Sequence, residues 1–213
     1  MADQLALLII DMQRDFLDPE GYIARSGVDV RPLRAIIPNV RRLLETARER
    51  RIPVIHTREG HRSDLSDLPA VKGRRAARAG VAIGSPGPLG RLLVRGEPGH
   101  AIVAELAPLA TEVVIDKPGF GAFYATDLEH VLRTAGIRAL ALVGVTTDVC
   151  VHSTLREAVD RGFDCLTVGD ACAAGDADIH AAMLACIRGE GGILGGVSTT
   201  EEVLNAWQPG GSR

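Results

Sequence analysis

The sequence predicts an α/β fold, a three-layer α/β/α sandwich built on a mostly parallel six-stranded sheet. Short apolar runs alternate along the chain with amphipathic segments of helical spacing, and no internal repeat interrupts this order. The first run, Leu5–Ile10, is apolar at every position, which is typical of a strand buried on both faces. Strand–helix alternation with right-handed crossovers gives a parallel sheet covered by helices on both sides.

Each expected element has its own signal. Pro53 opens the second strand, and Arg31–Arg51 carries apolar residues at helical spacing with arginines on the other side. Gly136 and Gly162 end two of the helices, as glycine commonly does. After the first strand, further strands are expected at Ile52–Thr57, Glu112–Ile115, Ala139–Val143, Cys165–Val168 and Ile193–Leu194. Helices are expected at Arg31–Arg51, Asp127–Ala135, Asp148–Arg161, Asp176–Gly189 and Thr199–Ala206.

Residues 58–98 break this rhythm. They contain four prolines and little periodicity, at Pro69, Pro86, Pro88 and Pro98. A loop of this length inside a compact domain is usually functional, so we expect a lid over an active site or a subunit contact. The chain has 213 residues, enough for one sizeable core, and residues 1–213 are expected to form a single domain.

The composition argues against several classes of partner. A hydrophobic content of 46%, a charged content of 24% and a net charge of −3 give no reason to expect a nucleic-acid or membrane partner. The run Leu5–Ile10 is too short to span a bilayer and lacks the flanks of a signal peptide, so a cytoplasmic location is expected. Four cysteines without CxxC spacing predict free thiols.

Reactive side chains follow three of the predicted strands. In open α/β sheets, ligands bind beyond the carboxyl ends of the strands. Asp11 follows the first strand, Lys117 the third and Cys150 the fourth. A cysteine hydrolase needs these groups, because a carboxylate can take the thiol proton and return it to a leaving amine. We expect the ammonium and the helix N-terminus to lower the pKa of Cys150 toward neutrality.

Each residue taken alone also has a structural interpretation. A cysteine near a helix start is commonly a buried apolar side chain, and an aspartate after a strand commonly caps a loop. His56 and His61 lack the spacing of known ligand sets, so no metal and no cofactor are expected. Thr146 and Thr147 are expected to cap the helix with their hydroxyls, which leaves backbone N–H groups free to hold an oxyanion.

Three motifs follow one another across nearly the whole chain: LLIIDMQRDF, VIDKPGFGAFYATDLE and GVTTDVCVHSTLREAVDRGF. Together they resemble the isochorismatase-like cysteine hydrolases. The resemblance implies that Asp11, Lys117 and Cys150 are the catalytic residues. It also implies a cis peptide bond between Val145 and Thr146, and an oxyanion hole formed by the backbone N–H groups of Thr146 and Cys150. True isochorismatases lack the cysteine, so Cys150 indicates amide or ureide hydrolysis.

A narrower resemblance lies in HTREGHRSDLSDLP and GSPGPLGRLLVRGEPGH, which are similar to biuret hydrolase and its triuret-type relatives. Nicotinamidases carry an Asp-Trp-His metal motif where this chain reads Thr-Arg-Glu-Gly-His over residues 57–61, so the resemblance implies no metal. Two positions depart from the biuret hydrolase pattern. Glu190 replaces a glutamine before Gly-Gly, and Phe120 replaces a second lysine. An ionised Glu190 cannot donate a hydrogen bond, which changes the substrates that fit.

The expected activity is hydrolysis of a terminal carbamoyl C–N bond of a small ureide, of the biuret or triuret type, with release of ammonia from a covalent intermediate on Cys150. The alternatives are another amidase of the family, acting on an N-carbamoyl compound, maleamate or nicotinamide, and a non-catalytic interaction domain. A homo-oligomer, dimer or tetramer, is implied by the resemblance. The residues expected to bind the substrate are Phe16, Arg58, Phe123, Tyr124, Val145, Thr146 and Glu190.

Overall fold

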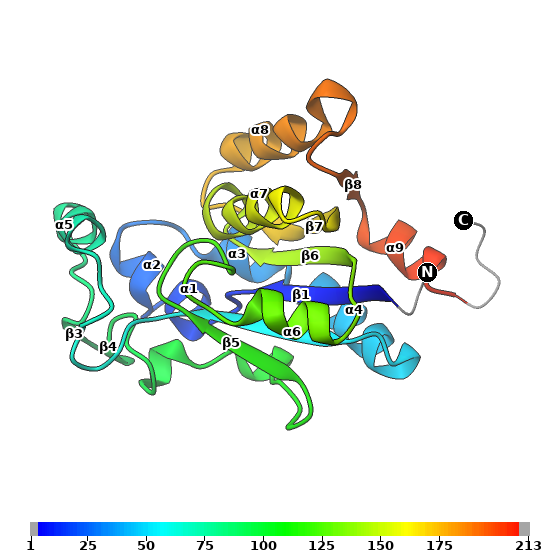
Figure 1. The fold of residues 1–213 in the computed structure, drawn as a ribbon. Coiled ribbons are helices and arrows are strands. Elements are labelled where there is room, and N and C mark those ends of the chain that lie inside the picture. The colour runs from blue at the N-terminus through cyan, green and yellow to red at the C-terminus, as the bar shows by residue number, and fades with distance from the viewer. Residues whose placement is uncertain (1–3, 209–213) are drawn as a thin grey trace.

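The computed structural model describes residues 4–208, and its centre is a six-stranded sheet in the order β5-β2-β1-β6-β7-β8 (Figure 1). Every neighbouring pair in this sheet is parallel, which confirms the predicted α/β sandwich. Its strands are β1 (Leu5–Ile10), β2 (Val54–Glu59), β5 (Val113–Lys117), β6 (Ala139–Val145), β7 (Asp164–Ala173) and β8 (Gly196–Ser198). A separate antiparallel pair consists of β3 (Pro86–Gly87) and β4 (Gly90–Arg91).

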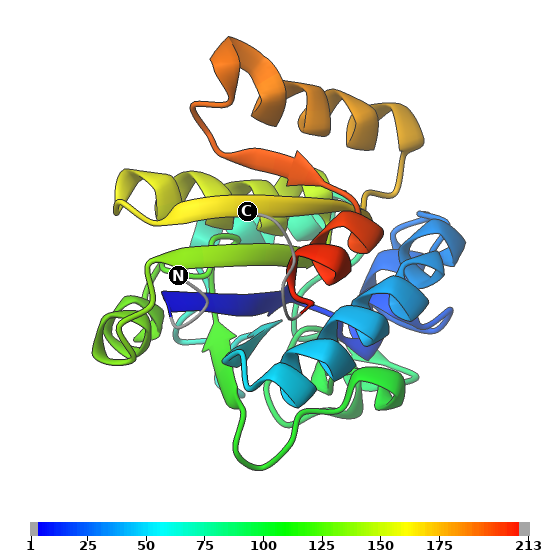
Figure 2. The ribbon, with the colours of Figure 1, turned by 90° about the vertical axis from the view of Figure 1, so that its right-hand side faces the viewer.

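Helices cover both faces of the sheet (Figure 2). Because successive side chains of a strand point to opposite faces, Leu7 and Ile9 pack in one apolar cluster with α4 and α9, whereas Leu8 and Ile10 pack in a second with α6 and α7. The α-helices are α1 (Arg14–Leu17), α2 (Tyr22–Arg25), α3 (Arg31–Ala35), α4 (Ile37–Arg50), α5 (Ala70–Arg78), α6 (Leu128–Thr134), α7 (His152–Asp160), α8 (Ala177–Arg188) and α9 (Thr200–Ala206). Shorter turns are η2 (Pro98–His100), η3 (Ala104–Leu106), η4 (Thr147–Val151, π-helical) and η5 (Gly189–Gly191).

Two helices differ from their predicted form. The segment expected as one helix over Arg31–Arg51 is divided into α3 and α4, with Pro38 in the first turn of α4, where its missing N–H has no helical partner to lose. Apolar spacing alone did not reveal the break, because both helices bury residues in the same cluster. The helix expected over Asp148–Arg161 begins as the π-helical turn η4 and continues as α7.

Residues 58–98 are more ordered than the predicted long loop. They contain the nine-residue helix α5 and the β3–β4 pair. Among the residues of α5 only Ala76 is buried, so the helix carries too little apolar periodicity to be recognised from the sequence. It lies at the end of the molecule toward which β1, β2 and β5 point their carboxyl ends (Figure 1).

Neighbouring strands end side by side at this edge of the sheet. Glu59 at the end of β2 is in register with Lys117 at the end of β5, and Ile10 of β1 is in register with Gly144 of β6. Gly144 has a φ of 118°, and a Cβ atom there would collide with the backbone oxygen of Ile10. Glycine therefore lets the ends of β1 and β6 approach closely. Within residues 4–208, no helix combines the length and the apolar character needed to cross a bilayer.

Candidate active site

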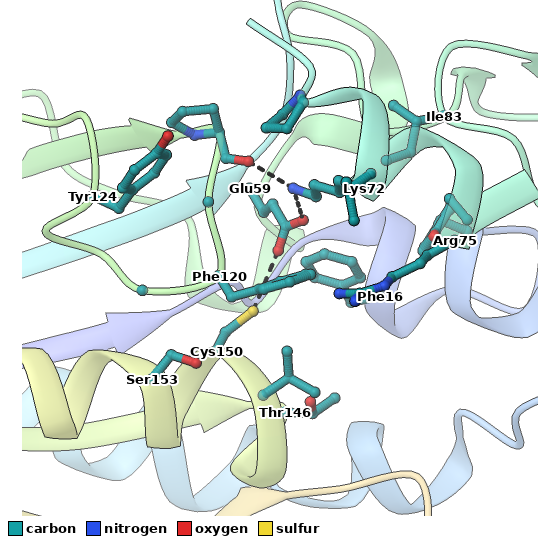
Figure 3. Close-up of a pocket in the computed structure, with 18 of the residues that line it drawn as sticks. Phe16, Glu59, Lys72, Arg75, Ile83, Phe120, Tyr124, Thr146, Cys150 and Ser153 are labelled. Carbon is teal, nitrogen blue, oxygen red and sulfur yellow. Dashed lines mark hydrogen bonds and ion pairs between the residues drawn. The ribbon is translucent and has the colours of Figure 1, made fainter.

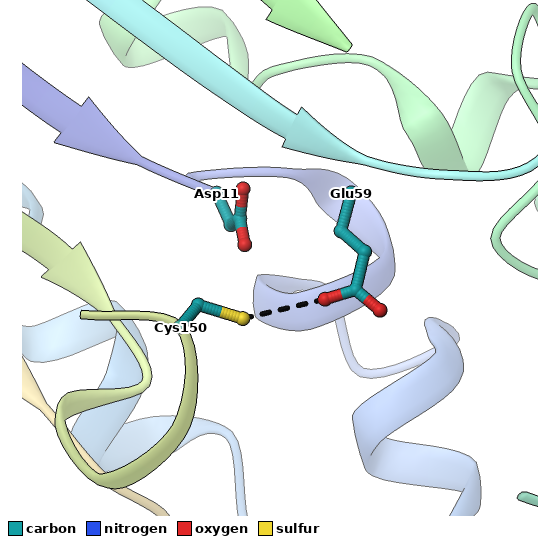
Figure 4. A group of neighbouring side chains, drawn as sticks. All are labelled: Asp11, Glu59 and Cys150. Atoms are coloured by element: carbon teal, nitrogen blue, oxygen red, sulfur yellow. Dashed lines mark hydrogen bonds between the residues drawn. The ribbon is translucent and has the colours of Figure 1, made fainter. Parts of the chain in front are cut away.

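Four side chains from four segments meet at the carboxyl edge of the sheet: Asp11, Glu59, Lys117 and Cys150. The Lys117 Nζ lies 2.7 Å from Asp11 Oδ2 and 3.5 Å from Glu59 Oε2, and the Cys150 Sγ lies 3.3 Å from Glu59 Oε2. Figure 4 shows both carboxylates directed toward the sulfur. All four residues are buried. The three predicted residues Asp11, Lys117 and Cys150 are thus brought together, and a carboxylate that was not predicted joins them.

Asp11 is fixed by the turn that follows β1. Its backbone has a φ of 51°, a left-handed conformation that aspartate tolerates better than most residues. The Thr57 hydroxyl donates a hydrogen bond of 2.6 Å to Asp11 Oδ1, while Asp11 Oδ2 receives the Lys117 ammonium. Each oxygen of the carboxylate therefore has one close partner, and the side chain is held in a single orientation.

Lys117 is held as an ammonium ion inside the protein. Its Nζ donates hydrogen bonds to the backbone oxygens of Gly119 at 3.0 Å and Phe120 at 2.9 Å, in addition to its ion pair with Asp11. Burial on its own lowers the pKa of Lys117, but the neighbouring carboxylates of Asp11 and Glu59 outweigh this effect and raise it above its ordinary value. Lys117 is therefore charged across the physiological range.

Cys150 lies in the π-helical turn η4, directly after β6. The peptide bond between Val145 and Thr146 is cis, as the family resemblance implied. The predicted hydroxyl caps are absent in this part of the structure, because Thr146 makes no side-chain cap and the Thr147 hydroxyl contacts His180 Nδ1 at 2.8 Å. Thr147 thus ties the turn to the first part of α8.

The predicted low pKa of Cys150 is wrong for the substrate-free site. Burial raises the pKa of the Cys150 thiol well above its ordinary value, and the carboxylates of Asp11 and Glu59 add to the increase against the opposing effect of Lys117. Sequence spacing revealed the lysine but neither the depth of burial nor the second carboxylate. The sulfur rests as a neutral thiol that donates a hydrogen bond to Glu59.

The two carboxylates are in different protonation environments. Burial raises the pKa of Asp11 above its ordinary value, although Lys117 opposes the shift. Burial also acts to raise the pKa of Glu59, but Lys117 and Lys72 outweigh it and hold that pKa below its ordinary value. Because a base must be able to take a proton, Asp11 is the better acceptor for the thiol proton, and Glu59 remains ionised.

The cluster opens into a cavity of about 640 Å³ (Figure 3). Cys150 and Glu59 reach the cavity from the sheet side, and Lys72 and Arg75 reach it from α5. Most other lining groups are apolar or aromatic, including Phe16, Tyr22, Ile23, Val71, Ile83, Phe120 and Tyr124. A concave site with a few convergent polar groups among apolar walls is the usual form of a small-molecule site.

Three of the residues expected to bind substrate line this cavity, namely Phe16, Tyr124 and Thr146. Two others are held elsewhere by strand pairing and core packing. Arg58 lies opposite Asp116 across the β2–β5 pair, and their side chains form an ion pair with a distance of 2.7 Å. Phe123 is buried against Phe163, with ring centroids 5.8 Å apart.

Val145 and Glu190 are also outside the cavity lining. The Val145 side chain is fully buried in the core that includes α4 and α9. Glu190 is exposed and follows the end of α8, whereas His180, which contacts Thr147 of the turn η4, lies near the beginning of that helix. The 12 residues of α8 separate Glu190 from the end of the helix that contacts η4. The Gly-Gly pattern after Glu190 in the sequence did not indicate this separation.

Glu59 and Lys72 are the residues of the site that sequence reasoning missed. Lys72 Nζ lies 2.6 Å from Glu59 Oε1 and donates a hydrogen bond of 2.6 Å to the backbone oxygen of Pro118. Glu59 could have been found, because it ends β2 at the same edge as the other groups. Lys72 had no such signal, since the helix that carries it was not predicted.

Asp11, Glu59 and Cys150 place three potential ligand atoms within 4.8 Å of one another. A cation at this point would have to displace or approach two ammonium groups, because Lys117 binds one carboxylate and Lys72 the other. The donor set is therefore neutralised by the protein's own lysines, which makes it a poor fit for a metal ion.

This chain is similar to known proteins in both sequence and structure. The isochorismatase domain family matches residues 5–202. Ureidoacrylate amidohydrolase RutB of Acinetobacter baylyi is 30% identical over 210 residues, covering 97% of this chain and 84% of that protein. RutB of Yersinia enterocolitica is 34% identical over 155 residues, covering 71% and 67%. A cysteine hydrolase structure from Pseudomonas syringae pv. phaseolicola has a TM-score of 0.83 at 28% identity, covering 97% of this chain and 93% of that chain.

Proposed function

The chain belongs to the isochorismatase family, and on this premise we propose that it is a cysteine-dependent amidohydrolase that cleaves the terminal carbamoyl C–N bond of a small ureide. One observation carries the proposal. A buried thiol faces a cavity and lies beside a carboxylate that is bound to a lysine, with the Lys117 Nζ 2.7 Å from Asp11 Oδ2. Nucleophile, base and orienting charge are the parts that covalent amide hydrolysis requires.

In the proposed reaction Asp11 takes the proton of Cys150 as the sulfur attacks the carbamoyl carbon. The S–C bond forms, the carbonyl electron pair moves to oxygen, and backbone N–H groups of Thr146 and Cys150 hold the oxyanion. When the C–N bond breaks, Asp11 gives its proton to the leaving nitrogen, which departs as ammonia. Water then loses a proton to Asp11, attacks the same carbon and releases the acid, and the proton returns to the sulfur.

The names of the relatives support the reaction class. The RutB proteins are amidohydrolases of ureidoacrylate, a compound with a terminal carbamoyl group. For this chain we propose a ureide of the biuret or triuret type as substrate. Its size is compatible with a cavity of about 640 Å³, and its carbamoyl group would lie over Cys150 between Phe16 and Phe120.

A panel of amides assayed for ammonia release tests this function. We expect turnover of at least one ureide among biuret, triuret, ureidoacrylate and N-carbamoyl amino acids, and rates lower by at least about 100-fold with maleamate and nicotinamide. The last two lack the second nitrogen on the carbonyl that distinguishes a ureide. Equal or faster hydrolysis of nicotinamide would contradict the proposed substrate class.

A second candidate substrate is a ureide that carries a carboxylate, and Arg75 favours it. Arg75 lines the cavity, is exposed, and within residues 4–208 makes no ion pair or side-chain hydrogen bond. A guanidinium in this position is suited to bind a carboxylate with two hydrogen bonds. A neutral substrate such as biuret would gain nothing comparable from this residue.

Replacement of Arg75 distinguishes the two substrates. For Arg75→Gln we expect KM for an acidic ureide to rise by about tenfold or more, with KM for biuret unchanged. Arg78→Gln is the matched control, because Arg78 lies on the same helix, is exposed and does not line the cavity. An unchanged KM for every acidic ureide that the enzyme turns over would remove the support for this candidate.

The homo-oligomer implied by the resemblance stays a prediction. Light scattering coupled to size-exclusion chromatography would test it, with a dimer or tetramer as the expected result. The proposed mechanism places every reacting group on one chain, so it does not depend on this outcome.

A further inference from the structure

On the basis of the function proposed above, we propose that Glu59 is a fourth catalytic group. It holds Cys150 as a thiol until substrate binds, and Lys72 of helix α5 is the positioning residue that keeps it in place. Both carboxylate oxygens of Glu59 are committed: Oε2 lies 3.3 Å from the Cys150 sulfur, and Oε1 lies 2.6 Å from Lys72 Nζ. The mechanism above makes no use of this buried group.

The backbone of Glu59 is fixed as firmly as its side chain. The Glu59 N–H donates a hydrogen bond of 2.6 Å to Gln13 Oε1, and Gln13 Nε2 donates one of 2.9 Å to the Glu59 carbonyl oxygen. Gln13 is itself fully buried. A glutamine side chain that satisfies both polar groups of one residue aligns that residue in the protein interior. The backbone and the side chain of Glu59 are therefore both held in the position that brings its carboxylate to the sulfur.

The lysine content of the chain points to the same residue. Of 24 lysine and arginine residues, only Lys72 and Lys117 are lysines, and both lie within 3.5 Å of a Glu59 oxygen. An ammonium is a compact point charge with three rotatable donors, whereas a guanidinium is a wide planar fork. Both cations next to Glu59 are therefore the compact ammonium groups of lysine, whereas the other basic side chains of the chain are arginines.

The charges around Glu59 balance when the sulfur is protonated. The groups that face it are Asp11, Lys117, Lys72 and Cys150, together with Tyr22 of α2 and His61. Burial raises the pKa of Tyr22 to about 12 and lowers that of His61, so both are neutral near pH 7. Two carboxylates then face two ammonium ions, and a thiolate would add one uncompensated negative charge.

This balance gives Glu59 a role at each stage of the reaction. Before attack, its negative charge opposes ionisation of Cys150 and its oxygen accepts the thiol hydrogen bond. When the thiol proton passes to Asp11, the cluster keeps its net charge. As the S–C bond forms, negative charge moves from the sulfur to the substrate oxygen and away from Glu59. Relative to the thiolate, repulsion by Glu59 therefore favours bond formation, and Glu59 itself gains and loses no proton.

Lys72 connects Glu59 to the wall of the cavity. Its ammonium joins Glu59 to the Pro118 backbone oxygen, and it lies 5.0 Å from the centroid of the Phe120 ring (Figure 3). Only Ala76 of α5 is buried, so apolar packing contributes little to holding this helix. The Lys72 contacts are the polar link between α5 and the reacting sulfur.

Alkylation of Cys150 by iodoacetamide, followed by peptide mass spectrometry, tests the role of Glu59. In the substrate-free Glu59→Gln protein we expect alkylation at neutral pH to be faster than in the wild type by about tenfold or more, with its pH profile displaced to lower pH. We expect kcat to fall by about tenfold or more, because the charged hydrogen-bond partner that orients the Cys150 sulfur is lost. Glu59→Asp, which keeps the charge, should label slowly, like the wild type.

Two results would overturn the proposal. One is an alkylation rate in Glu59→Gln equal to or below that of the wild type. The other is fast alkylation in both Glu59→Gln and Glu59→Asp, which would mean that opening of the site, and not loss of charge, exposes the sulfur. Labelling of the exposed Cys186 in the same samples controls for reagent and protein concentration.

Lys72→Met provides a second test should Glu59→Gln fail to fold. We expect kcat to fall by about tenfold or more while KM changes less than threefold, because positioning of the nucleophile is lost and the cavity is kept. Arg74→Gln, an exposed residue of the same helix outside the cavity lining, is the control. Unchanged kcat in Lys72→Met would overturn the positioning role.

The alkylation assay needs no substrate, so its outcome is independent of the proposed function. If no ureide is hydrolysed but Glu59→Gln still accelerates labelling, the reaction is wrong and the thiol-holding role stands. If ureides are hydrolysed and labelling is not accelerated, the reaction stands and the role of Glu59 is wrong.

Discussion

Cys150→Ser is expected to lower ammonia release from the preferred ureide by about 10⁴-fold or more, because the nucleophile of the reaction is lost. The serine hydroxyl is far less acidic than the thiol, so Asp11 cannot take its proton. The side chain becomes only slightly smaller, and the free energy of unfolding should change by no more than about 1 kcal/mol. Steady-state ammonia assays and urea unfolding measure the two quantities on the same preparation.

Cys172→Ser is the matched control for this variant. Cys172 is also a buried cysteine, 2% exposed, on the neighbouring strand β7, but its Sγ contacts the Leu142 backbone oxygen and not the cavity. We expect it to retain most of the activity. Activity of Cys150→Ser above one tenth of the wild-type rate would contradict the assignment of Cys150 as nucleophile.

Lys117→Met is expected to cause the largest loss of stability together with complete loss of turnover. Lys117 is fully buried and lies 2.7 Å from Asp11 Oδ2 and 3.5 Å from Glu59 Oε2. Removing the ammonium leaves both carboxylates without this partner, and losing one member of a buried ion pair costs about 3–5 kcal/mol. Activity is lost because Asp11 then binds its proton too firmly to exchange it with the sulfur.

The destabilisation of Lys117→Met should depend on pH. Without the ammonium, burial of Asp11 is no longer opposed, and the pKa of its carboxyl in the folded variant rises further above its unfolded value, whereas Glu59 keeps its ion pair with Lys72. A carboxyl group with a raised pKa in the folded state does not lower the free energy of unfolding below its unfolded pKa, which is about 4. It lowers the free energy of unfolding increasingly as pH rises above that value. The difference in free energy of unfolding between wild type and variant should therefore be larger at pH 7 than at pH 4.

Lys72→Met is the control for this stability measurement. Its ion pair with Glu59 is also short, but Glu59 keeps Lys117 as a neighbour when Lys72 is replaced, and no second carboxylate loses a partner. We expect a smaller loss, about 1–3 kcal/mol. A larger loss for Lys72→Met than for Lys117→Met would contradict the account of the charge balance.

The position of the site was predictable because parallel strands end at one edge. Asp11, Lys117 and Cys150 each follow a strand in the sequence, and the register of the sheet brings them together. The alternation of strands and helices likewise predicted a sheet covered by helices on both faces. These inferences need only the backbone direction of each element, which periodicity supplies.

Features that depend on side-chain direction or burial were not predictable in this way. Arg58 pairs with Asp116 across two strands, and Phe123 turns to the core, although both lie in motifs near the site. The raised pKa of Cys150 follows from its burial and from the carboxylate of Glu59, which the sequence does not place. Lys72 was not predicted, because its helix α5 buries a single residue and so has no apolar periodicity in the sequence.

The most direct test of the proposed function is rapid-quench mass spectrometry of the enzyme during turnover of its preferred ureide. We predict a transient adduct on the peptide that contains Cys150, with a mass equal to the substrate minus one ammonia, formed before the acid product is released and absent in Cys150→Ser. Turnover without any adduct in the wild type at quench times shorter than one cycle, or an adduct on another residue, would contradict covalent catalysis by Cys150.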